Sequence, residues 1–451
     1  MALQAAIDAY HALLDDELGQ LTQSQLTQQL EARGLTFGQR LLVSVLRPRF
    51  LAPEQYRFLQ ERVHVLLHSF GKIYRRAMED PQFRGQFGLF DWEETLIADD
   101  PGFKASSPLS RLDAFFVHER GGLRFTEYNA ETPAGASYND ILAEATLGLP
   151  AMRAFMKQYE VRPLPSRHNV MHALLDAWQQ FSGQSKAKPR IAILDWPDVP
   201  TYSEFVLTQN YLHDQGLECV IADPRSVEYR NGRLLAEGVE IDLIYKRVLI
   251  NELIDRCGLD HAVVRAVRER AVCMVNPFRC KILHKKLSLA VLSDEHNHDM
   301  FSAGEVECIQ QHIPWTRRVA EMRTKFHDED VDLLPFVAAN REKLVLKPND
   351  EYGGKGIVLG WEVSDDAWQQ AVRDAQNEPF IVQERIDLPV EPYPVLVDGK
   401  VRIEDRIEDT APFVFYGEFM DGLMSRLSTE SLVNVTAGGG SSVATFIVAA
   451  R

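Results

Sequence analysis

The stretch LVLKPNDEYGGKGIVLG, residues 344–360, is the most informative part of the sequence. An apolar run ends in Lys347 and Pro348, a polar loop follows, and a second apolar run begins directly after the loop. The loop contains Gly353, Gly354, Lys355 and Gly356. Because glycines have no Cβ, backbone N–H groups in such a loop can approach phosphate oxygens closely, and a lysine on the adjoining strand adds positive charge. The pattern predicts a triphosphate site, with a plain glycine turn carrying an exposed lysine as the alternative.

Two familiar phosphate loops do not fit this stretch. Its glycines do not have the G-x-G-x-x-G spacing that precedes a helix. A P-loop requires Gly-Lys followed by Ser or Thr at the start of a helix, whereas Gly356 leads into Ile-Val-Leu. A glycine loop between two strands remains.

A second informative stretch is RLDAFFVHERGGLRFTEYNAETPAG, residues 111–135, which has the alternation of a β-hairpin. Strand alternation places Glu127 and Asn129 on the same face. If a three-residue Arg-Gly-Gly turn closes the hairpin, Asp113 lies opposite Asn129 and Phe115 lies opposite Glu127. Three oxygen-bearing side chains then share one face.

Two carboxylates and an amide are the hard oxygen ligands that suit Mg²⁺ bound to a nucleotide. A turn longer or shorter by one residue would send Asp113 to the other face, so this prediction depends on the register. Arg111 would share the face of Asp113 and could meet phosphate or substrate charge. A solvated polar face of an amphipathic hairpin is the alternative.

Length and composition describe a soluble globular protein of several lobes. The chain has 451 residues, 45% of them hydrophobic, and a formal net charge of −16. Its length is roughly three times that of a typical ~150-residue domain, so two or three lobes are expected. Net acidity without a basic block disfavours binding to nucleic acid.

The cysteines and the N-terminus indicate the compartment. Five cysteines, none in C-x-x-C spacing, predict reduced thiols. The first residues have no basic segment followed by an apolar one, so we expect no signal peptide. No run reaches the ~18 apolar residues of a membrane span. We therefore expect a cytoplasmic protein without membrane partners.

The order of the predicted elements indicates an α/β chain. Three- and four-residue spacing of apolar residues, as in Tyr56, Leu59, Val63 and Leu66, predicts helices up to about residue 95. After the hairpin, a strand–helix–strand pattern predicts an open α/β layer. The expected elements are strands near 190–196, 217–224 and 240–249, a helix over 203–215, helices over 260–340 and strands from 343. We expect domains over 1–165, 166–255 and 256–451.

Several motifs together resemble the ATP-grasp superfamily. They are the glycine loop after a lysine-ending strand, the Q-E-R-I run from Gln383, and Arg426 followed by Asn434 to Gly440. In most members the metal ligands follow these elements, whereas the D…E-x-N hairpin precedes them here by more than 200 residues. This order resembles the circularly permuted ATP-grasp proteins. Over residues 105–445, the motifs are most similar to the synthetase domain of glutathionylspermidine synthetase and its bacterial homologues.

The resemblance implies a circularly permuted ATP-grasp fold with a Rossmann-like layer and a helical N-terminal segment. It implies Mg²⁺ binding by Asp113, Glu127 and Asn129. It also implies that ATP contacts Lys347 and Lys286, with Lys285 as a nearby competitor for the second role, and that Gln383 or Glu384 lies at the hinge that meets adenine. Arg426 would steady the transferred phosphoryl group.

The implied activity is that of an ATP-dependent carboxylate–amine ligase acting through an acyl phosphate. Phosphate transfer to a small acceptor and a non-catalytic nucleotide-binding subunit are the alternatives. The acid, the amine and the oligomeric state are not predicted. Lys246 and Arg247, at the end of a predicted strand, are candidates for substrate contact. Because the first cysteine is Cys219, we expect no cysteine amidase domain of the kind that precedes some synthetases.

Overall fold

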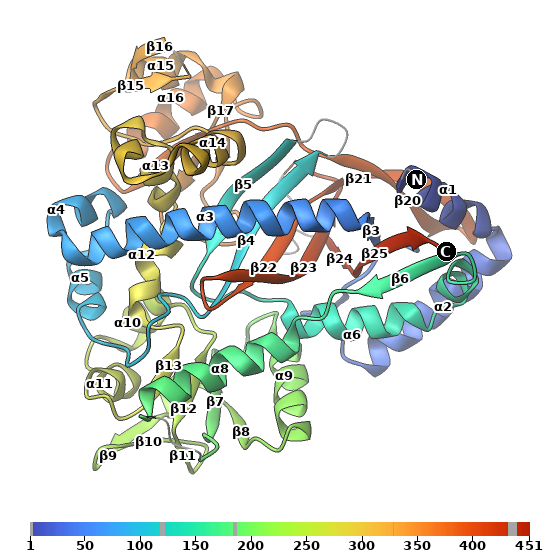
Figure 1. The fold of residues 1–451 in the computed structure, drawn as a ribbon, viewed down its shortest axis with the longest axis horizontal. Coiled ribbons are helices and arrows are strands. Elements are labelled where there is room, and N and C mark those ends of the chain that lie inside the picture. The colour runs from blue at the N-terminus through green and yellow to red at the C-terminus, as the bar shows by residue number, and fades with distance from the viewer. Residues whose placement is uncertain (1–2, 118–121, 184–186, 328, 432–439) are drawn as a thin grey trace.

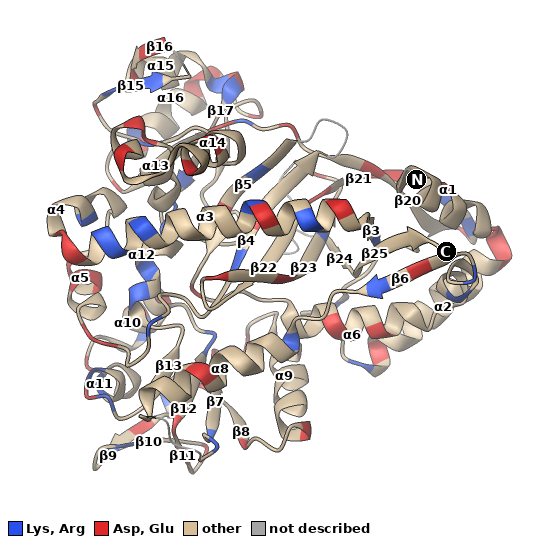
Figure 2. Cartoon of the chain, viewed as in Figure 1, with Lys and Arg blue, Asp and Glu red and all other residues tan. Residues whose placement is uncertain are grey.

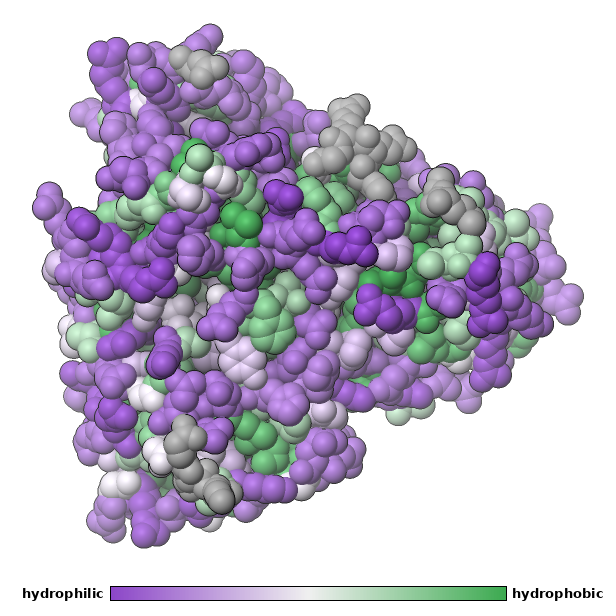
Figure 3. Space-filling view, viewed as in Figure 1, coloured by the Kyte–Doolittle hydropathy of each residue, from purple (hydrophilic) through white to green (hydrophobic). Residues whose placement is uncertain are grey.

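The structure is a computed structural model, which describes residues 3–117, 122–183, 187–327, 329–431 and 440–451 (Figure 1). A central sheet lies behind the long helix α3, an α/β layer lies at one end of the molecule, and a smaller mixed lobe lies at the other. Both acidic and basic residues lie along α3 (Figure 2). On the face in Figure 3, the described residues present mainly hydrophilic side chains, with apolar ones in separate small groups.

The N-terminal region is helical, as its apolar spacing predicts. The predicted stripe of α3 is buried, with Leu59, Val63 and Leu66 each 0% exposed. Short strands interrupt the helices. The elements are α1 (Leu3–Leu13), α2 (Asp16–Ala32), β1 (Thr36–Phe37), β2 (Arg40–Leu41), β3 (Arg49–Leu51), α3 (Pro53–Glu79), α4 (Pro81–Arg84) and α5 (Asp91–Ile97).

The central sheet joins the early hairpin to strands from the end of the chain. Its order is β20-β21-β23-β22-β4-β5, with β24 beside β23. The link is the antiparallel pair β22·β4, in which Phe413 lies opposite Arg111. The strands are β4 (Leu109–Val117), β5 (Gly122–Asn129), β20 (Val390–Val397), β21 (Lys400–Glu408), β22 (Ala411–Phe415), β23 (Phe419–Ser428) and β24 (Ser441–Val443).

The predicted register of the hairpin was wrong. Asp113 lies opposite Glu127, and Arg111 lies opposite Asn129. The ladder then shifts between Asp113 and Ala114, because Thr126 is an extra residue on β5, as in a β-bulge. Most of the expected turn lies within residues 118–121, which are outside the described residues. Since the register differs from the predicted one by two positions, the same side chains still share one face.

The α/β layer is a parallel sheet of order β13-β12-β7-β8. The predicted strand–helix–strand pattern is confirmed by β7 (Ile191–Leu194), α9 (Tyr202–Asp214) and β8 (Cys219–Ala222). The expected strand over 240–249 is split between β11 and β12. The remaining elements are α8 (Arg167–Phe181), β9 (Glu228–Arg230), β10 (Arg233–Ala236), β11 (Val239–Ile241), β12 (Leu243–Lys246), α10 (Ile250–Cys257), α11 (Ala262–Arg268) and β13 (Cys273–Val275).

The expectation of helices alone over residues 260–340 was wrong, because β13 and three further strands lie there. These strands are only three or four residues long, and β15 and β16 are rich in charge, so they lack an apolar strand signal. The elements after β13 are α12 (Lys281–His284), α13 (Leu287–Ser293), α14 (Ala303–His312), β14 (Thr316–Arg318), β15 (Arg323–Phe326), β16 (Glu329–Asp332) and α15 (Leu333–Ala339).

The mixed lobe contains the glycine loop. Its sheet has the order β14-β19-β17-β18, and the loop joins the antiparallel strands β17 and β18. The strand–loop–strand prediction is therefore confirmed. The elements are β17 (Leu344–Pro348), β18 (Val358–Leu359), α16 (Asp365–Asp374) and β19 (Phe380–Glu384).

A small sheet brings the two ends of the chain together, where Figure 1 places both termini. In it β25 (Thr445–Ala450) runs parallel to β3 and antiparallel to β6 (Tyr159–Pro163). The helices α6 (Ala136–Leu147) and α7 (Pro150–Phe155) lie nearby. All five cysteines have free thiols. In the described part of the chain, no helix combines the length and apolarity of a membrane span.

Candidate active site

One cavity, of about 290 Å³, joins the early hairpin to the glycine loop. Eight of the predicted site residues line it: Asp113, Glu127, Lys347, Gly353, Gly354, Gln383, Glu384 and Arg426. Five do not, namely Arg111, Asn129, Lys286, Lys355 and Gly356. The remaining lining comes mostly from apolar residues of β17, β18 and the segment after β19, including Val345, Ile357, Leu359, Trp361, Ile386 and Leu388.

Asp113 is held by two arginines. Arg111 donates to both of its carboxylate oxygens, at 2.6 Å from Nε and 2.8 Å from Nη2, and Arg426 Nη2 lies 2.9 Å from Oδ2. Burial raises the pKa of Asp113, but the two guanidinium groups outweigh it and lower the pKa to about 2. Asp113 is therefore a carboxylate at neutral pH.

Arg111 does not line the cavity but stabilises the hairpin. Its side chain is buried, and its Nη1 donates to the backbone oxygen of Ala134 at 2.8 Å while the other nitrogens bind Asp113. These contacts fix the orientation of Asp113 and of the chain that leaves β5.

Glu127 and Asn129 complete the acidic face. Lys286 Nζ lies 3.0 Å from Glu127 Oε1. Burial raises the pKa of Glu127, yet Lys286 lowers it enough that the net shift is downward. Within the described residues, Oδ1 of Asn129 is a buried oxygen without a hydrogen-bond partner. Such an atom is costly unless a ligand satisfies it.

Lys347 reaches from β17 toward the hairpin. Its Nζ donates to Gln383 Oε1 at 2.7 Å and lies 3.5 Å from the backbone oxygen of Thr126. Burial lowers the pKa of Lys347 to about 8, because the opposing effect of Glu127 is too weak and Lys286 lowers it further.

The two adjacent lysines point to different places. Lys286 donates to the backbone oxygen of Glu351, in the glycine loop, at 2.6 Å, and pairs with Glu127. Lys285 instead pairs with Glu93 at 2.8 Å and Asp350 at 2.9 Å. The structure therefore brings Lys286, and not Lys285, to the acidic face.

The glycine loop depends on backbone conformations that favour glycine. Gly353, Gly354 and Gly356 have φ of +64°, +78° and +71°. The first two line the cavity, whereas a Cβ on Gly356 would lie 2.7 Å from Pro348 Cγ. Lys355 points away, with its side chain 75% exposed and its Nζ 3.1 Å from Glu351.

The end of β19 forms the opposite wall. Gln383 is buried and links Lys347 to Thr316, to which its Nε2 donates at 3.0 Å. Glu384 is partly exposed, and its Oε1 lies 2.9 Å from Nε2 of His327. Gln383 therefore orients Lys347, while Glu384 faces the rim.

Arg426 lies between two carboxylates. Besides Asp113, it binds Asp409, which receives its backbone N–H at 2.7 Å and its Nε at 2.6 Å. Asp409 also lines the cavity. Asp409 is not among the residues predicted from the sequence, because no local motif marks it and its role arises only when β23 passes the turn after β21. Asn434 lies outside the described residues.

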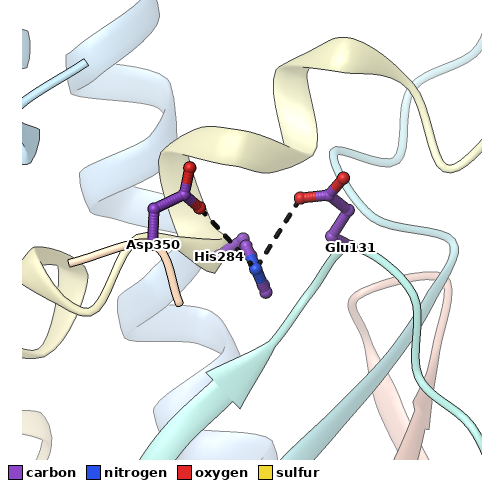
Figure 4. Close-up of side chains that lie close together, drawn as sticks. All are labelled: Glu131, His284 and Asp350. Atoms are coloured by element: carbon purple, nitrogen blue, oxygen red, sulfur yellow. Dashed lines mark ion pairs between the residues drawn. The ribbon is translucent and has the colours of Figure 1, made fainter. Parts of the chain in front are cut away.

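A buried charge network lies beside the cavity. We use this name for Glu93, Glu131, Lys246, Lys281, His284, Lys285 and Asp350. Figure 4 shows Glu131, His284 and Asp350 pointing toward one another, with His284 Nε2 3.6 Å and 3.8 Å from the two carboxylates. The arrangement resembles a metal site. However, Lys281 Nζ lies 3.2 Å from Glu131 and 2.6 Å from Asp350, so an ammonium group already supplies the positive charge.

Lys246 and Arg247, predicted as substrate contacts, are both buried. Lys246 pairs with Glu131 at 3.3 Å, within the buried charge network. Arg247 Nη1 donates to the backbone oxygen of Pro133 at 2.5 Å. Both residues hold the segment that follows β5.

The residues present fit a magnesium–nucleotide complex. Asp113, Glu127 and Asn129 offer hard oxygen donors, and the orphaned amide oxygen of Asn129 is the observation that favours a bound ion. Lys286, Lys347, Arg426 and the loop N–H groups suit phosphate. The apolar walls of the cavity suit the nucleobase of a nucleotide.

The central sheet, the glycine loop and the acid-bearing hairpin define an ATP-grasp fold. A protein-family model, described as a circularly permuted ATPgrasp, matches residues 113–383, more than half of the chain. The protein therefore belongs to the circularly permuted ATP-grasp family, as its motif order predicts.

Several known proteins are similar to this chain. Uncharacterised proteins of Mycobacterium tuberculosis and Mycobacterium bovis are 25% identical over 340 residues, 71% of this chain. The match covers only 57% of the length of each of these relatives. A solved structure of a glutathione synthetase-like effector from Globodera pallida, in apo form, is similar with a TM-score of 0.60 and 13% identity, covering 96% of this chain and 98% of that one.

Proposed function

We propose that this protein is an ATP-dependent carboxylate–amine ligase. One observation carries the proposal: the acid-bearing hairpin and the glycine loop, far apart in sequence, line the same cavity. Contacts across it are direct, with Lys286 3.0 Å from Glu127 and Lys347 3.5 Å from the backbone of Thr126. A site of acids, lysines and an arginine suits chemistry in which charge is neutralised and reactants are aligned.

The reaction solves a leaving-group problem. A carboxylate is a poor acyl donor, because its oxygen is a poor leaving group. ATP supplies the phosphoryl group: a carboxylate oxygen of the substrate attacks the γ-phosphorus, and ADP leaves. An amine nitrogen then attacks the acyl carbon, phosphate leaves, and the nitrogen loses a proton, which gives the amide.

The chain's own residues hold the charges of this reaction. Lys347 and Lys286 would bind phosphate oxygens, and the N–H groups around Gly353 and Gly354 would approach them from the loop. Arg426 would bind the transferred phosphoryl group, because its Nη2 already points at the acidic face. Electrostatic groups placed in advance in a water-poor site are the main source of such catalysis.

Asp113, Glu127 and Asn129 would hold Mg²⁺, which neutralises the phosphates. The segment from Gln383 to Leu388 would hold adenine, with apolar contacts from Ile386 and Leu388 and from Trp361 and Ile357. The substrates would be a small carboxylic acid and an amine. Five free thiols favour a reducing compartment, so we propose a cytoplasmic location.

The reaction class is tested by the requirements for ADP release. Purified protein with Mg²⁺ and ATP would be screened against amino acids, short peptides and polyamines, the last because the motifs resemble glutathionylspermidine synthetase. A ligase releases ADP and phosphate at full rate only when both an acid and an amine are present. A stable phosphorylated product from one substrate would indicate a phosphotransferase, and ATP binding without turnover would indicate a non-catalytic subunit.

Glu127→Gln tests the metal assignment. The variant keeps the shape of the side chain but removes a hard anionic ligand, so ATP turnover falls by about 10² or more. Mn²⁺ binding, measured without nucleotide, weakens as well. Glu378→Gln, at an exposed position before β19, is the matched control and leaves both unchanged. Full turnover in folded Glu127→Gln protein would reject the assignment.

A further inference from the structure

Asp409 lies where the central sheet meets the cavity, between β21 and β22. It is only 2% exposed and lines the same cavity as Asp113. Its backbone is fixed by two bonds: its N–H donates to the backbone oxygen of Arg426 at 2.9 Å, and its carbonyl accepts from Arg49 Nη1 at 3.0 Å. The carboxylate is therefore presented by a rigid segment.

The carboxylate of Asp409 binds one edge of Arg426. Oδ1 accepts the backbone N–H of Arg426 at 2.7 Å, and Oδ2 accepts Nε at 2.6 Å and also contacts Nη2. The backbone and the inner edge of the guanidinium are thus fixed together. Nη2 is shared between the two carboxylates, because it also lies 2.9 Å from Oδ2 of Asp113.

Asp113 would keep a positively charged partner if Arg426 moved away. Arg111 already forms a two-point pair with Asp113, at 2.6 Å and 2.8 Å. A cation bound at the acidic face of Asp113, Glu127 and Asn129 would compensate the same carboxylate. Arg426 Nη2 can therefore leave Asp113 without stranding a buried charge, while the backbone N–H and Nε stay on Asp409.

We propose that Asp409 is a positioning residue for phosphoryl transfer. It holds the backbone and Nε of Arg426 while Nη2 exchanges Asp113 for an oxygen of the transferred phosphoryl group. This inference rests on the proposed function. It goes beyond that function by assigning to Asp409 the orientation of the arginine, an assignment that the family's motifs do not make here.

A different role for Asp409, as a direct metal ligand, fits the contacts less well. Oδ1 already receives the backbone N–H of Arg426, and Oδ2 receives its guanidinium, so that this second hydrogen bond has charge on both partners and is among the strong ones. The proposed role in positioning Arg426 requires no change in these contacts, whereas metal binding would.

The test compares two probes: MgADP alone, and MgADP with aluminium fluoride, which mimics a phosphoryl group in transfer. Asp409→Asn keeps the shape but replaces one accepting oxygen by an NH₂ group. Because small misplacements of aligned groups cost up to about 10²-fold, we expect binding of the aluminium fluoride complex to weaken by about 10- to 100-fold. Binding of MgADP alone should change by less than about twofold, since Arg426 acts on the transferred group.

A double-variant cycle separates positioning from a structural role. Arg426→Ala should give the same selective loss. Adding Asp409→Asn to Arg426→Ala should then change the affinity by less than about twofold, because residues that act through one another are not additive. Additive losses, or equal losses for both probes, would overturn the inference. Asp405→Asn, at an exposed position on β21, is the control and should behave like the unaltered protein.

Folding and the proposed function are checked separately. If Asp409→Asn does not fold, Asp409→Glu, which keeps the charge but moves the carboxylate, is expected to show the same probe-selective loss, and an unselective loss would overturn the inference. If the unaltered protein binds MgADP but not the aluminium fluoride complex, the proposed function itself fails, and the role of Asp409 fails with it. A loss of affinity confined to the aluminium fluoride complex, together with non-additive effects in the double-variant cycle, supports both the proposed function and the role of Asp409.

Discussion

At the scale of single residues, the two lysines at 285 and 286 show what sequence periodicity can and cannot predict. Treated as one continuous helix, the stripe of Leu283 and Leu287 leaves both lysines at its border, so no choice follows. In the structure α12 ends at His284, the ψ of Lys285 is 129°, which is not helical, and α13 begins after Lys286. The break sends one lysine into the buried charge network and the other to Glu127.

Lys347 gives the site a predicted pH dependence. Because burial lowers its pKa to about 8, the ammonium is present in the nucleotide-free protein below that pH and is lost as pH rises through it. Affinity for MgADP, measured from pH 6.5 to 9.5, should therefore be constant at low pH and then fall by up to about tenfold per unit.

Two variants separate the loss of the Lys347 charge from other effects of pH on MgADP binding. Lys347→Arg keeps its charge over the whole range and should show little dependence on pH. Lys347→Met should bind weakly at every pH. An unaltered protein whose affinity is the same at pH 7 and pH 9.5 would contradict the assignment of Lys347 to the phosphates.

At the scale of elements, the hairpin shows why its ligand face could be predicted although its register could not. Alternation fixes which side chains share a face, and the error of two positions preserves that alternation. The bulge at Thr126 depends on how β5 packs, as well as on its own residues. The short, charged strands β15 and β16 were missed because pairing, rather than an apolar run, makes them strands.

The glycine loop gives a prediction about conformation. Gly356→Ala would place a Cβ at positive φ and 2.7 Å from Pro348 Cγ, whereas Gly34→Ala has a similar φ, +65°, and no atom within 4 Å. The left-handed conformation costs a residue with Cβ about 1–2 kcal/mol, so both variants should lower the unfolding free energy by that amount. Gly356→Ala should cost more.

The two glycine variants should also differ in binding. Displacement of Pro348 would move Lys347, its neighbour on β17, so Gly356→Ala should weaken MgADP binding by several-fold, on the order of 1 kcal/mol. Gly34→Ala, far from the loop in sequence and placed after α2, should bind normally. Urea denaturation and a binding titration of each variant decide the point; equal binding by the two would contradict the claim that the loop's shape matters.

At the scale of the whole molecule, motif order predicted that residues near 113–129 and 344–384 meet, and the central sheet shows how. β4 pairs with β22, so the hairpin joins the C-terminal strands. The sequence did not predict the sheet of β3, β25 and β6, whose strands are short and come from distant parts of the chain. Nor did it predict the buried charge network, because pairing of acids and lysines far apart in sequence has no local periodicity.

The buried charge network gives the last prediction, because it joins α5, the end of β5, β12, α12 and the glycine loop. Glu131 is 0% exposed and contacts Lys281 at 3.2 Å and Lys246 at 3.3 Å. Glu131→Gln removes one partner of buried charges and should lower the unfolding free energy by about 3–5 kcal/mol at pH 7. Glu144→Gln, in a pair with side-chain exposure of 47%, should cost less than about 1 kcal/mol.

The unaltered protein and Glu131→Gln differ in unfolding free energy, and the effect of pH on this difference tests whether the charge of Glu131 causes it. Although burial raises the pKa of Glu131, Lys281 and Lys246 hold it well below the usual value for a glutamate. Its stabilising effect is therefore fully present above the pKa of the unfolded chain, about 4.3, and is lost as pH falls below it. Urea denaturation at pH 7 and pH 3 should show the gap between the unaltered protein and Glu131→Gln shrinking at the lower pH. A gap of equal size at both would mean that packing around Glu131, rather than its charge, holds these five segments together.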